Sequence, residues 1–428
     1  MRGILVLMVL LVSQAAAALD LGPLDVDATV RVLPSYSWDA KGSPFFVPRP
    51  YARLGGFSSE QTLELSTRYN GLNFTGMAGT DVDGGGRSRD ASVLNELFYE
   101  GQVNSLSYTI GKKITTWGVG HGYRPLDVVQ REDRQRLYPT PLEGIWQASV
   151  GYYGAEDAIN LVYANPGRGP KHDVSEDESI GLNYFRSMGP ADMHGVLRWS
   201  HRNQMQGGVG TAYVLTDAFE WHGEWLYQQR WSQPVPALPD LPQDLAHFDP
   251  DDLRPRDFYD LERHRGAQKA VLGGSWAWSN GWSLLGEAWY DGTAFTKQQW
   301  RDLVDLGKVG QYAFNLVGGL LPQRTLVSGT NLVSGGGSLG QDIELQNVLR
   351  TNYLLVLSQM KDGRWLNWTV GLQGTPEDGG LFSTLNLTHR EGVHTFGVTW
   401  RQFTGPRQSS YGALPMKGVV LLSWAASF

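Results

Sequence analysis

Hydrophobic and polar residues alternate with a period of two in many short segments of this chain. In Phe219–Trp231, the aromatic residues Trp225 and Tyr227 alternate with polar residues such as Glu224 and Gln228. This is the period of a β-strand with one apolar and one polar face, because successive side chains point to opposite sides. The same alternation recurs in Thr62–Asn70, Ser105–Trp117, Trp365–Gln373 and His394–Gln402.

The alternating segments predict an all-β chain of about 18 strands that starts near Asp27, with 16 strands as the alternative count. The last segment ends the chain at Phe428, and its alternate positions Ala426, Trp424 and Leu422 are also apolar. A closing strand with an aromatic last residue is typical of bacterial outer-membrane β-barrels. The competing interpretation, a terminal strand of a soluble sandwich, makes a different prediction about the turns.

Short and long connections alternate along the chain. Turn signals such as Asn70-Gly71 and Asn280-Gly281 mark one set of short connections, and the alternate set contains the long ones. Sorting of this kind predicts a transmembrane antiparallel β-barrel with short periplasmic turns, long extracellular loops and both termini in the periplasm. A soluble sandwich has no reason to sort its loops. The long loops are expected at residues 38–60, 118–144, 232–267, 292–343 and 406–416.

The first 18 residues have the pattern of a cleaved signal peptide. Arg2 precedes the apolar run Ile4–Val12, and small residues at Ala15–Ala18 offer a cleavage site. The run is too short to cross about 30 Å of hydrocarbon as a helix. We therefore expect residues 1–18 to direct export and residues 19–428 to form one barrel in the bacterial outer membrane. An exported chain without a spanning helix enters lipid as a closed sheet.

Composition narrows the function further. The chain has no cysteine, so it has neither disulfides nor thiolate chemistry. Its formal charge of −7 argues against a nucleic-acid partner, which calls for a basic surface. The mean hydropathy of −0.30 resembles that of a soluble protein, but a barrel places apolar residues only at every second position.

Two of the long loops have distinct compositions. Residues 232–267 contain six prolines and many acids, and are expected to lack regular structure. Residues 296–322 place Trp300, Leu303 and Val304 near helical spacing and are expected to contain a short helix.

The densest polar cluster lies in the loop that follows Ser105–Trp117. Gly118, Gly120 and Gly122 permit a sharp turn at the barrel mouth, so we expect this loop to fold inward and narrow the lumen. Its arginines would then face the channel or pair with acids of the barrel wall. The alternative is an exposed loop held by its own ion pairs. The candidate constriction residues are Arg124, Asp127, Arg131, Glu132, Asp133, Arg134 and Arg136.

This part of the chain resembles Gram-negative outer-membrane porin-like barrels and, more distantly, alginate-export-type barrels. The likeness is carried by Gly111-Lys112-Lys113, then Trp117-Gly118, then Arg124-Pro125-Leu126-Asp127, and it extends only from Gly111 to Pro139. The resemblance implies a wide barrel with an inward loop and supplies no ligand. It implies a loop-shaping role for Trp117, Gly118, Pro125 and Asp127.

Alternation also assigns polar residues to the lumen. Glu220, His222 and Glu224 share one face of a strand and could bind a metal, but a polar lumen row explains them as well, and we expect no metal and no cofactor. Ser200 and His201 are adjacent and point to opposite faces, so we expect neither a nucleophile–base pair nor enzymatic activity. The candidate lumen-facing residues are Glu96, Glu100, Lys113, Arg198, Glu220, His222, Glu224, Arg350 and Arg401.

The expected function is therefore a porin-like channel for diffusion or export of a small hydrophilic solute, with the loop arginines biasing it toward anionic or polar cargo. The alternative is a closed structural or accessory barrel of an envelope secretion or polysaccharide-export system, with the 296–322 helix as a plug or docking element. The expected partners are outer-membrane lipid, the hydrophilic solute and the outer-membrane assembly machinery, which would read the strand ending at Phe428. The barrel is expected as a monomer or a homotrimer.

Overall fold

A computed structural model describes most of the chain. The described residues are 25–46, 56–86, 88–132, 137–138, 141–167, 177–236, 259–317, 347–361 and 363–428. The predicted signal peptide, residues 1–18, lies outside these ranges, as do Asp133, Arg134 and Arg136 of the candidate constriction.

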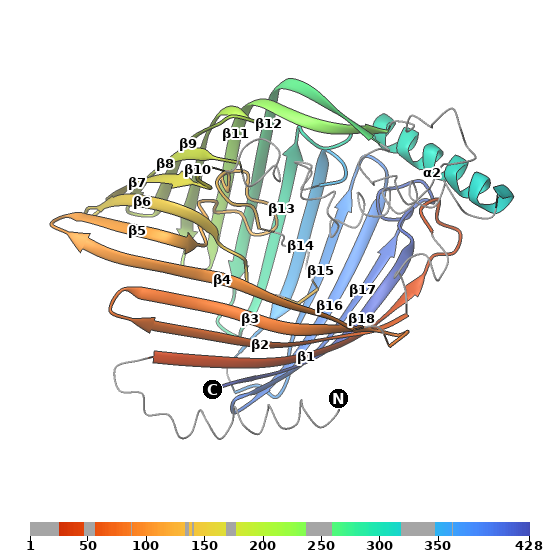
Figure 1. Cartoon of the computed structure of the whole chain (residues 1–428), viewed down its shortest axis with the longest axis horizontal. Coiled ribbons are helices and arrows are strands. Elements are labelled where there is room, and N and C mark those ends of the chain that lie inside the picture. Colours follow the sequence, from red (N-terminus) through yellow and green to blue (C-terminus); the bar gives the residue numbers. More distant parts are fainter. Residues whose placement is uncertain are drawn as a thin grey trace.

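Eighteen antiparallel strands form a single closed sheet, which confirms the predicted barrel and its strand number (Figure 1). The strands are β1 (Asp25–Asp39), β2 (Gly56–Tyr69), β3 (Leu72–Asp83), β4 (Ser88–Val103), β5 (Leu106–Lys113), β6 (Ile145–Tyr153), β7 (Asp157–Ala164), β8 (Ser179–Met188), β9 (Ala191–Ser200), β10 (Gln204–Thr216), β11 (Phe219–Pro236), β12 (Tyr259–Ala277), β13 (Trp282–Asp291), β14 (Thr351–Gln359), β15 (Asn367–Thr375), β16 (Gly380–Glu391), β17 (His394–Thr404) and β18 (Met416–Ser427).

The barrel closes where β18 pairs with β1. Val32 lies opposite Trp424, and two backbone hydrogen bonds join Ala28 to Phe428, at 3.1 and 2.9 Å. Each other strand pairs with its neighbours in sequence. Closure leaves no free sheet edge, which is the condition for a sheet to lie in lipid. It also places the start of β1 and the end of the chain at the same end of the barrel.

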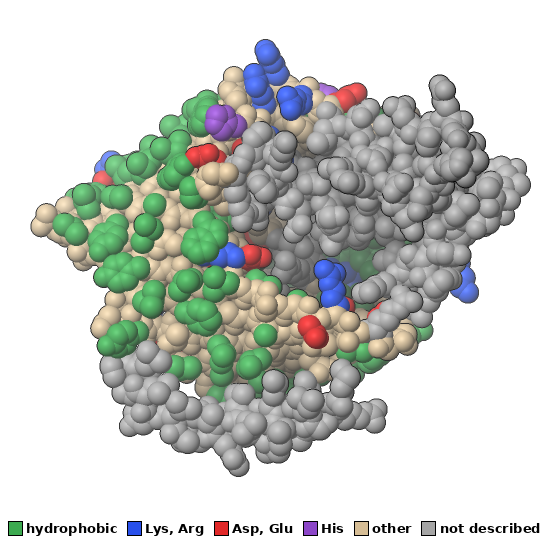
Figure 2. All heavy atoms as spheres, in the orientation of Figure 1, with side chains coloured by type: hydrophobic (Ala, Val, Ile, Leu, Met, Phe, Trp, Pro, Cys, Tyr) green, Lys and Arg blue, Asp and Glu red, His purple; other side chains and the backbone are tan. Residues whose placement is uncertain are grey.

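The outer face of the barrel is apolar and the inner face is polar. On β7 the large side chains of Ile159, Leu161 and Tyr163 are exposed, whereas Asn160 and Val162 alternate with them on the inner side. Figure 2 shows hydrophobic side chains spread over the outer surface at the left of the view, with few charged side chains among them. The chain is thus an outer-membrane type of barrel, with lipid outside and a polar lumen.

The alternation of short and long connections is confirmed. The β2–β3 turn consists only of Asn70 and Gly71, which have φ of 46° and 84°, the left-handed pair that a two-residue hairpin requires. The strand ends that flank the long connections, such as residues 40–55, 114–144 and 292–350, lie at the opposite end of the barrel from Phe428.

Three features of the strands differ from the sequence prediction. Residues 232–267 are not wholly irregular, because β11 and β12 stay paired as far as Pro236 opposite Tyr259. Proline is compatible with a strand wherever its position need not donate a hydrogen bond. On β11 the burial alternation also changes phase: Arg230, which would point inward if the alternation of Glu224 and Gln228 continued, is exposed, and Trp231 is buried. At this point Gln229 and Gly266 are left out of the pairing, while the register between the two strands stays the same, and Gly266 has a φ of 72°.

The third difference is at the end of β5. The strand ends at Lys113 rather than at Trp117, because the Ile114 N–H donates to the side-chain carboxylate of Glu96 on β4 at 2.9 Å instead of to a backbone carbonyl of a neighbouring strand. The chain therefore leaves the barrel wall four residues earlier than the alternation suggests, and the inward loop starts at Ile114.

The predicted helix is present as α2 (Lys297–Val317), at the end of the barrel opposite the C-terminus (Figure 1). It begins with a capping box: the Gln299 N–H donates to the Thr296 hydroxyl at 3.2 Å, and the Thr296 N–H donates to the Gln299 side chain at 2.9 Å. Trp300 is buried against Phe45 and Tyr411, which belong to two other loops of the same rim. Among the described residues, no helix is long and apolar enough to cross a membrane.

Candidate pore constriction

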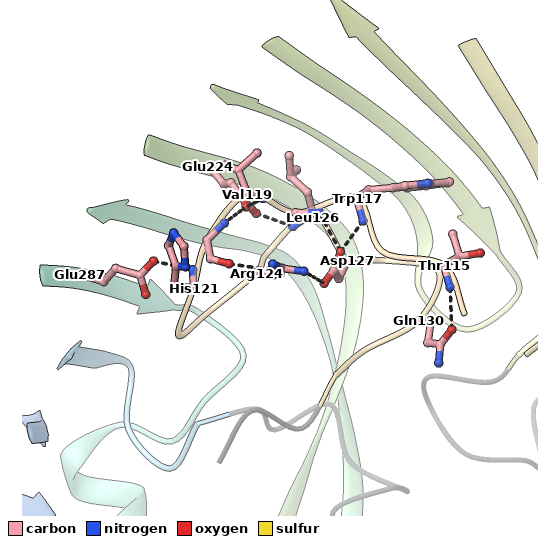
Figure 3. Close-up of polar contacts among 12 residues, drawn as sticks. Thr115, Trp117, Val119, His121, Arg124, Leu126, Asp127, Gln130, Glu224 and Glu287 are labelled. Carbon is pink, nitrogen blue, oxygen red and sulfur yellow. Dashed lines mark hydrogen bonds and ion pairs between the residues drawn. The ribbon is translucent and has the colours of Figure 1, made fainter. Parts of the chain in front are cut away.

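The loop between β5 and β6, residues 114–144, folds back along the inner wall of the barrel. We call it the inner loop; its residues 114–132, 137–138 and 141–144 are described. Asp127 shapes its first turn, because its carboxylate accepts the N–H groups of Trp117 and Gly118 at 2.5 and 2.7 Å (Figure 3). Trp117, Gly118 and Asp127 are positions that the family resemblance implied to shape the loop.

Glu224 of β11 anchors the inner loop to the wall through its backbone. The carboxylate is buried and accepts the N–H groups of Val119, Gly120 and Leu126, the last two at 2.7 and 2.9 Å (Figure 3). Hydrogen bonds to an ionised acceptor are stronger than neutral ones, so three on one carboxylate hold the loop firmly. Alternation had placed Glu224 in the lumen, but its partner was expected to be an arginine.

Glu287 of β13 forms a second anchor next to the first. Its two oxygens accept the N–H groups of His121 and Gly122 at 2.6 and 2.5 Å. Its third partner is His222 of β11, whose Nε2 lies 2.7 Å from Glu287 Oε1. A buried carboxylate can accept several hydrogen bonds at once, and the three donors here supply its oxygens with partners. The alternating glycines 118, 120 and 122 let the loop backbone approach both anchors closely.

Apolar contacts fix the other side of the inner loop. Leu126 is fully buried and lies against β10 where Gly208 and Gly210 leave a hollow. A Cβ on Gly208 would lie 2.6 Å from Leu126 Cδ2, and one on Gly210 would lie 2.8 Å from Cδ1. Only glycine at these two positions leaves room for the leucine.

Aromatic side chains extend these contacts along the wall. Trp117 and Val129 pack over Gly181 of β8, and Tyr123 stacks on Trp289 of β13 with ring centroids 5.9 Å apart. Offset stacking of this kind adds to the burial energy of the rings. The loop therefore covers the inner face of the barrel from β8 to β13 and narrows the lumen.

The candidate arginines are placed differently from the expectation. Arg124 is bound within the loop: its Nε donates to the Gly120 carbonyl at 2.6 Å, and its Nη1 lies 3.9 Å from Asp127. It does not pair with the wall acids, because Glu224 is already occupied by backbone N–H groups. Arg131 and Glu132 are half-buried, and both have interaction partners.

The other wall acids named from sequence also have different partners. Glu96 accepts the Ile114 N–H, and Glu100 lies 3.4 Å from the Lys113 ammonium group. Glu220 lies 3.9 Å from His222 Nδ1.

The remaining candidate lumen residues lie on separate parts of the barrel. Arg198 of β9 forms a buried ion pair with Asp177 at 2.7 Å. Arg401 of β17 lies over the Phe382 ring, 4.9 Å from its centroid, and donates to Thr384. Arg350 precedes β14 and donates to the Ala294 carbonyl at 3.3 Å.

Sequence reasoning missed the roles of three groups. Glu287 was not singled out as an anchor, although it falls at an inward position of an alternating strand. The hollow at Gly208 and Gly210 gave no signal, because glycine in a strand has several explanations. Gln130 accepts the Thr115 N–H at 3.0 Å and donates to the Glu143 carbonyl, which ties the two ends of the loop together (Figure 3).

Among the described residues, no group of three His, Cys, Asp or Glu residues is arranged to hold a metal ion. Ser200 is buried and bonded to Arg198 and Asn203, whereas His201 is exposed and packs against Trp199.

His121 makes the inner loop sensitive to pH. Burial is the main cause that lowers the pKa of His121 below its usual 6.5, against the opposing effect of Glu287; His222 and Arg124 lower it further. The folded state thus binds fewer protons than the unfolded state, so stability falls as pH drops below about 6.5. We expect faster protease cleavage of the loop at pH 5 than at pH 7.5. His121→Gln should reduce this difference, and an unchanged difference would contradict the assignment.

A closed barrel with an apolar outer face, a polar lumen and an inward loop is the architecture of outer-membrane channels. No protein-family model matches the chain, and no curated protein matches its sequence. Solved structures match its fold. OccK11 (OpdR) of Pseudomonas aeruginosa is 9% identical with a TM-score of 0.52, and the match covers 95% of this chain and 96% of that one.

Two other matches agree with the first. OccAB3 of Acinetobacter baumannii is 9% identical with a TM-score of 0.52, covering 95% of this chain and 99% of that chain. The outer membrane protein OprD of Pseudomonas aeruginosa is 7% identical with a TM-score of 0.52, covering 95% and 94%. At these identities the likeness establishes the fold, which spans nearly the whole length of each chain.

Proposed function

We propose that the protein is an outer-membrane channel through which small hydrophilic solutes diffuse, with the inner loop as its constriction. The observation that carries the proposal is the attachment of that loop to the inner wall by Glu224 and Glu287. A loop fixed by buried carboxylates keeps a constant position in the lumen, as a selective passage requires. Liposome swelling with sugars, dicarboxylates and phosphate tests the proposal, and an absence of swelling with every solute would contradict it.

The finer part of the proposal is a preference for anions. Arg131 and the arginines at 134 and 136 follow the anchored part of the loop, where a ring of positive charge would favour anions. Changing these three residues to Gln should lower the anion/cation permeability ratio several-fold, measured from reversal potentials in planar bilayers under a salt gradient. An unchanged ratio would count against the anion preference and leave the channel itself intact.

A closed accessory barrel is the second candidate. The packing of α2 on the rim, where Trp300 contacts Phe45 and donates to the Gln408 carbonyl, favours a fixed element near the mouth. If α2 blocks the mouth, the wild-type barrel has no conductance and deletion of residues 297–317 restores it. We propose transport without covalent chemistry, since Ser200 and His201 do not approach each other as nucleophile and base.

A further inference from the structure

We propose a binding site for a neutral, polyhydroxylated solute of monosaccharide size, in a recess of the lumen wall beside the inner loop. The recess has a volume of about 490 Å³, within the range of small-molecule sites. It lies between the start of the inner loop, at residues 113–117, and the β6–β7 turn, with β7 and β8 as its wall. The inference rests on the proposed channel function and names a solute class for it.

Two asparagines supply the polar contacts of this recess. Asn160 of β7 and Asn183 of β8 lie directly opposite each other in the strand register, and both line the recess. Asn160 Oδ1 and Asn183 Nδ2 are buried and have no hydrogen-bond partner among the described residues. A buried polar atom without a partner costs free energy, so a ligand that supplies the missing partners binds with a net gain.

The same two amides point to hydroxyl groups as the partners. Each amide carries a donor and an acceptor, whichever way its side chain is rotated. Neighbouring hydroxyls of a sugar both donate and accept, so they can satisfy the pair together. Tyr153, Phe185 and Trp117 line the same recess and offer apolar ring surface to the C–H faces of such a solute.

The charges around the recess do not favour an anion. Its only lysine, Lys113, lies 3.4 Å from Glu100, which offsets its charge. Two further acids, Glu156 and Asp157, line the end next to the β6–β7 turn. An anionic solute would meet more negative than positive charge, which disfavours its binding. The recess therefore selects by hydroxyl pattern, separately from the arginines of the inner loop.

The test measures the affinity of the purified, folded barrel for glucose in detergent micelles by isothermal titration calorimetry. Gluconate serves as an anionic analogue of similar size. We expect glucose to bind more tightly than gluconate. The double variant Asn160→Ala, Asn183→Ala should weaken glucose binding about 10- to 30-fold, the effect of losing two neutral hydrogen bonds.

Asn386→Ala is the matched control, because Asn386 is a lumen-wall amide on β16, far around the barrel from β7 and β8. It should leave glucose binding unchanged. Folding of each variant is checked by its altered gel migration before and after boiling. The site is refuted if glucose does not bind, if gluconate binds more tightly than glucose, or if the folded double variant binds glucose like the wild type.

A separate measurement distinguishes failure of the proposed binding site from failure of the proposed channel function. Titration in micelles reports binding whether or not the lumen conducts, whereas planar-bilayer conductance in potassium chloride reports the channel. A barrel that conducts ions but fails the titration test overturns the site alone. A barrel that binds glucose but never conducts overturns the channel and retains the site.

Discussion

Glu224→Ala is expected to release the inner loop from the barrel wall. The substitution removes the shared acceptor of the Val119, Gly120 and Leu126 N–H groups, which are held by charge-assisted hydrogen bonds. Such bonds contribute about 1.5–3 kcal/mol each, and part of the loss is recovered when the released groups reach water. Attachment should weaken by about 3–5 kcal/mol, which raises the detached population at least about 100-fold.

The measurement combines limited proteolysis with single-channel conductance. The released loop should be cleaved within residues 114–144, and the conductance should rise and fluctuate. Glu220→Ala is the matched control, since Glu220 lies four residues from Glu224 on β11 and its side chain is 38% exposed, with a 3.9 Å contact to His222. If both variants behave like the wild type, Glu224 does not anchor the loop.

Arg198→Ala should produce the largest loss of global stability. The Arg198 guanidinium donates to Asp177 at 2.7 Å and to Gln206 at 2.6 Å, and both side chains of the ion pair are 1% exposed. Removing the arginine leaves the Asp177 carboxylate buried without its charge partner, which costs about 3–5 kcal/mol. The free energy of unfolding in guanidinium chloride, followed by tryptophan fluorescence in lipid vesicles, measures this loss.

Two control variants distinguish the effect of losing the ion pair from the general effect of replacing an arginine. Arg230→Ala removes an exposed arginine of β11 and should change the free energy of unfolding by less than about 0.5 kcal/mol. The double variant Arg198→Met, Asp177→Leu removes both charges and should recover much of the stability lost in Arg198→Ala. An Arg198→Ala variant as stable as Arg230→Ala would show that the buried pair contributes little.

The barrel could be predicted because its determinants are local. The alternation in Phe219–Gln228 and the Asn70-Gly71 turn each depend on a few neighbouring residues, and both appear in the structure as expected. The helical spacing of Trp300, Leu303 and Val304 is equally local, so the helix within residues 296–322 was predicted close to its observed bounds, Lys297–Val317. The phase change after Gln228 was missed, because it depends on how two strands pair.

The candidate constriction was predicted in place but not in its contacts. The glycines and charges after Trp117 indicated an inward loop, and the charges suggested that arginines would hold it. The structure instead places loop backbone N–H groups on Glu224 and Glu287. A backbone donor is present at almost every residue, so nothing in a sequence marks which of them a distant carboxylate will accept.

The sequence alone determined the sheet, its two faces and the sorting of long loops to one end, and it limited the number of strands to about 18, with 16 as the alternative. These follow from a period of two residues and from turn chemistry, which act over short distances along the chain. The tertiary structure decided which wall the inner loop touches, which acids receive its backbone, and that Asn160 and Asn183 face each other across a recess. Those outcomes depend on barrel closure, which brings together residues as distant in sequence as Gly122 and Glu287.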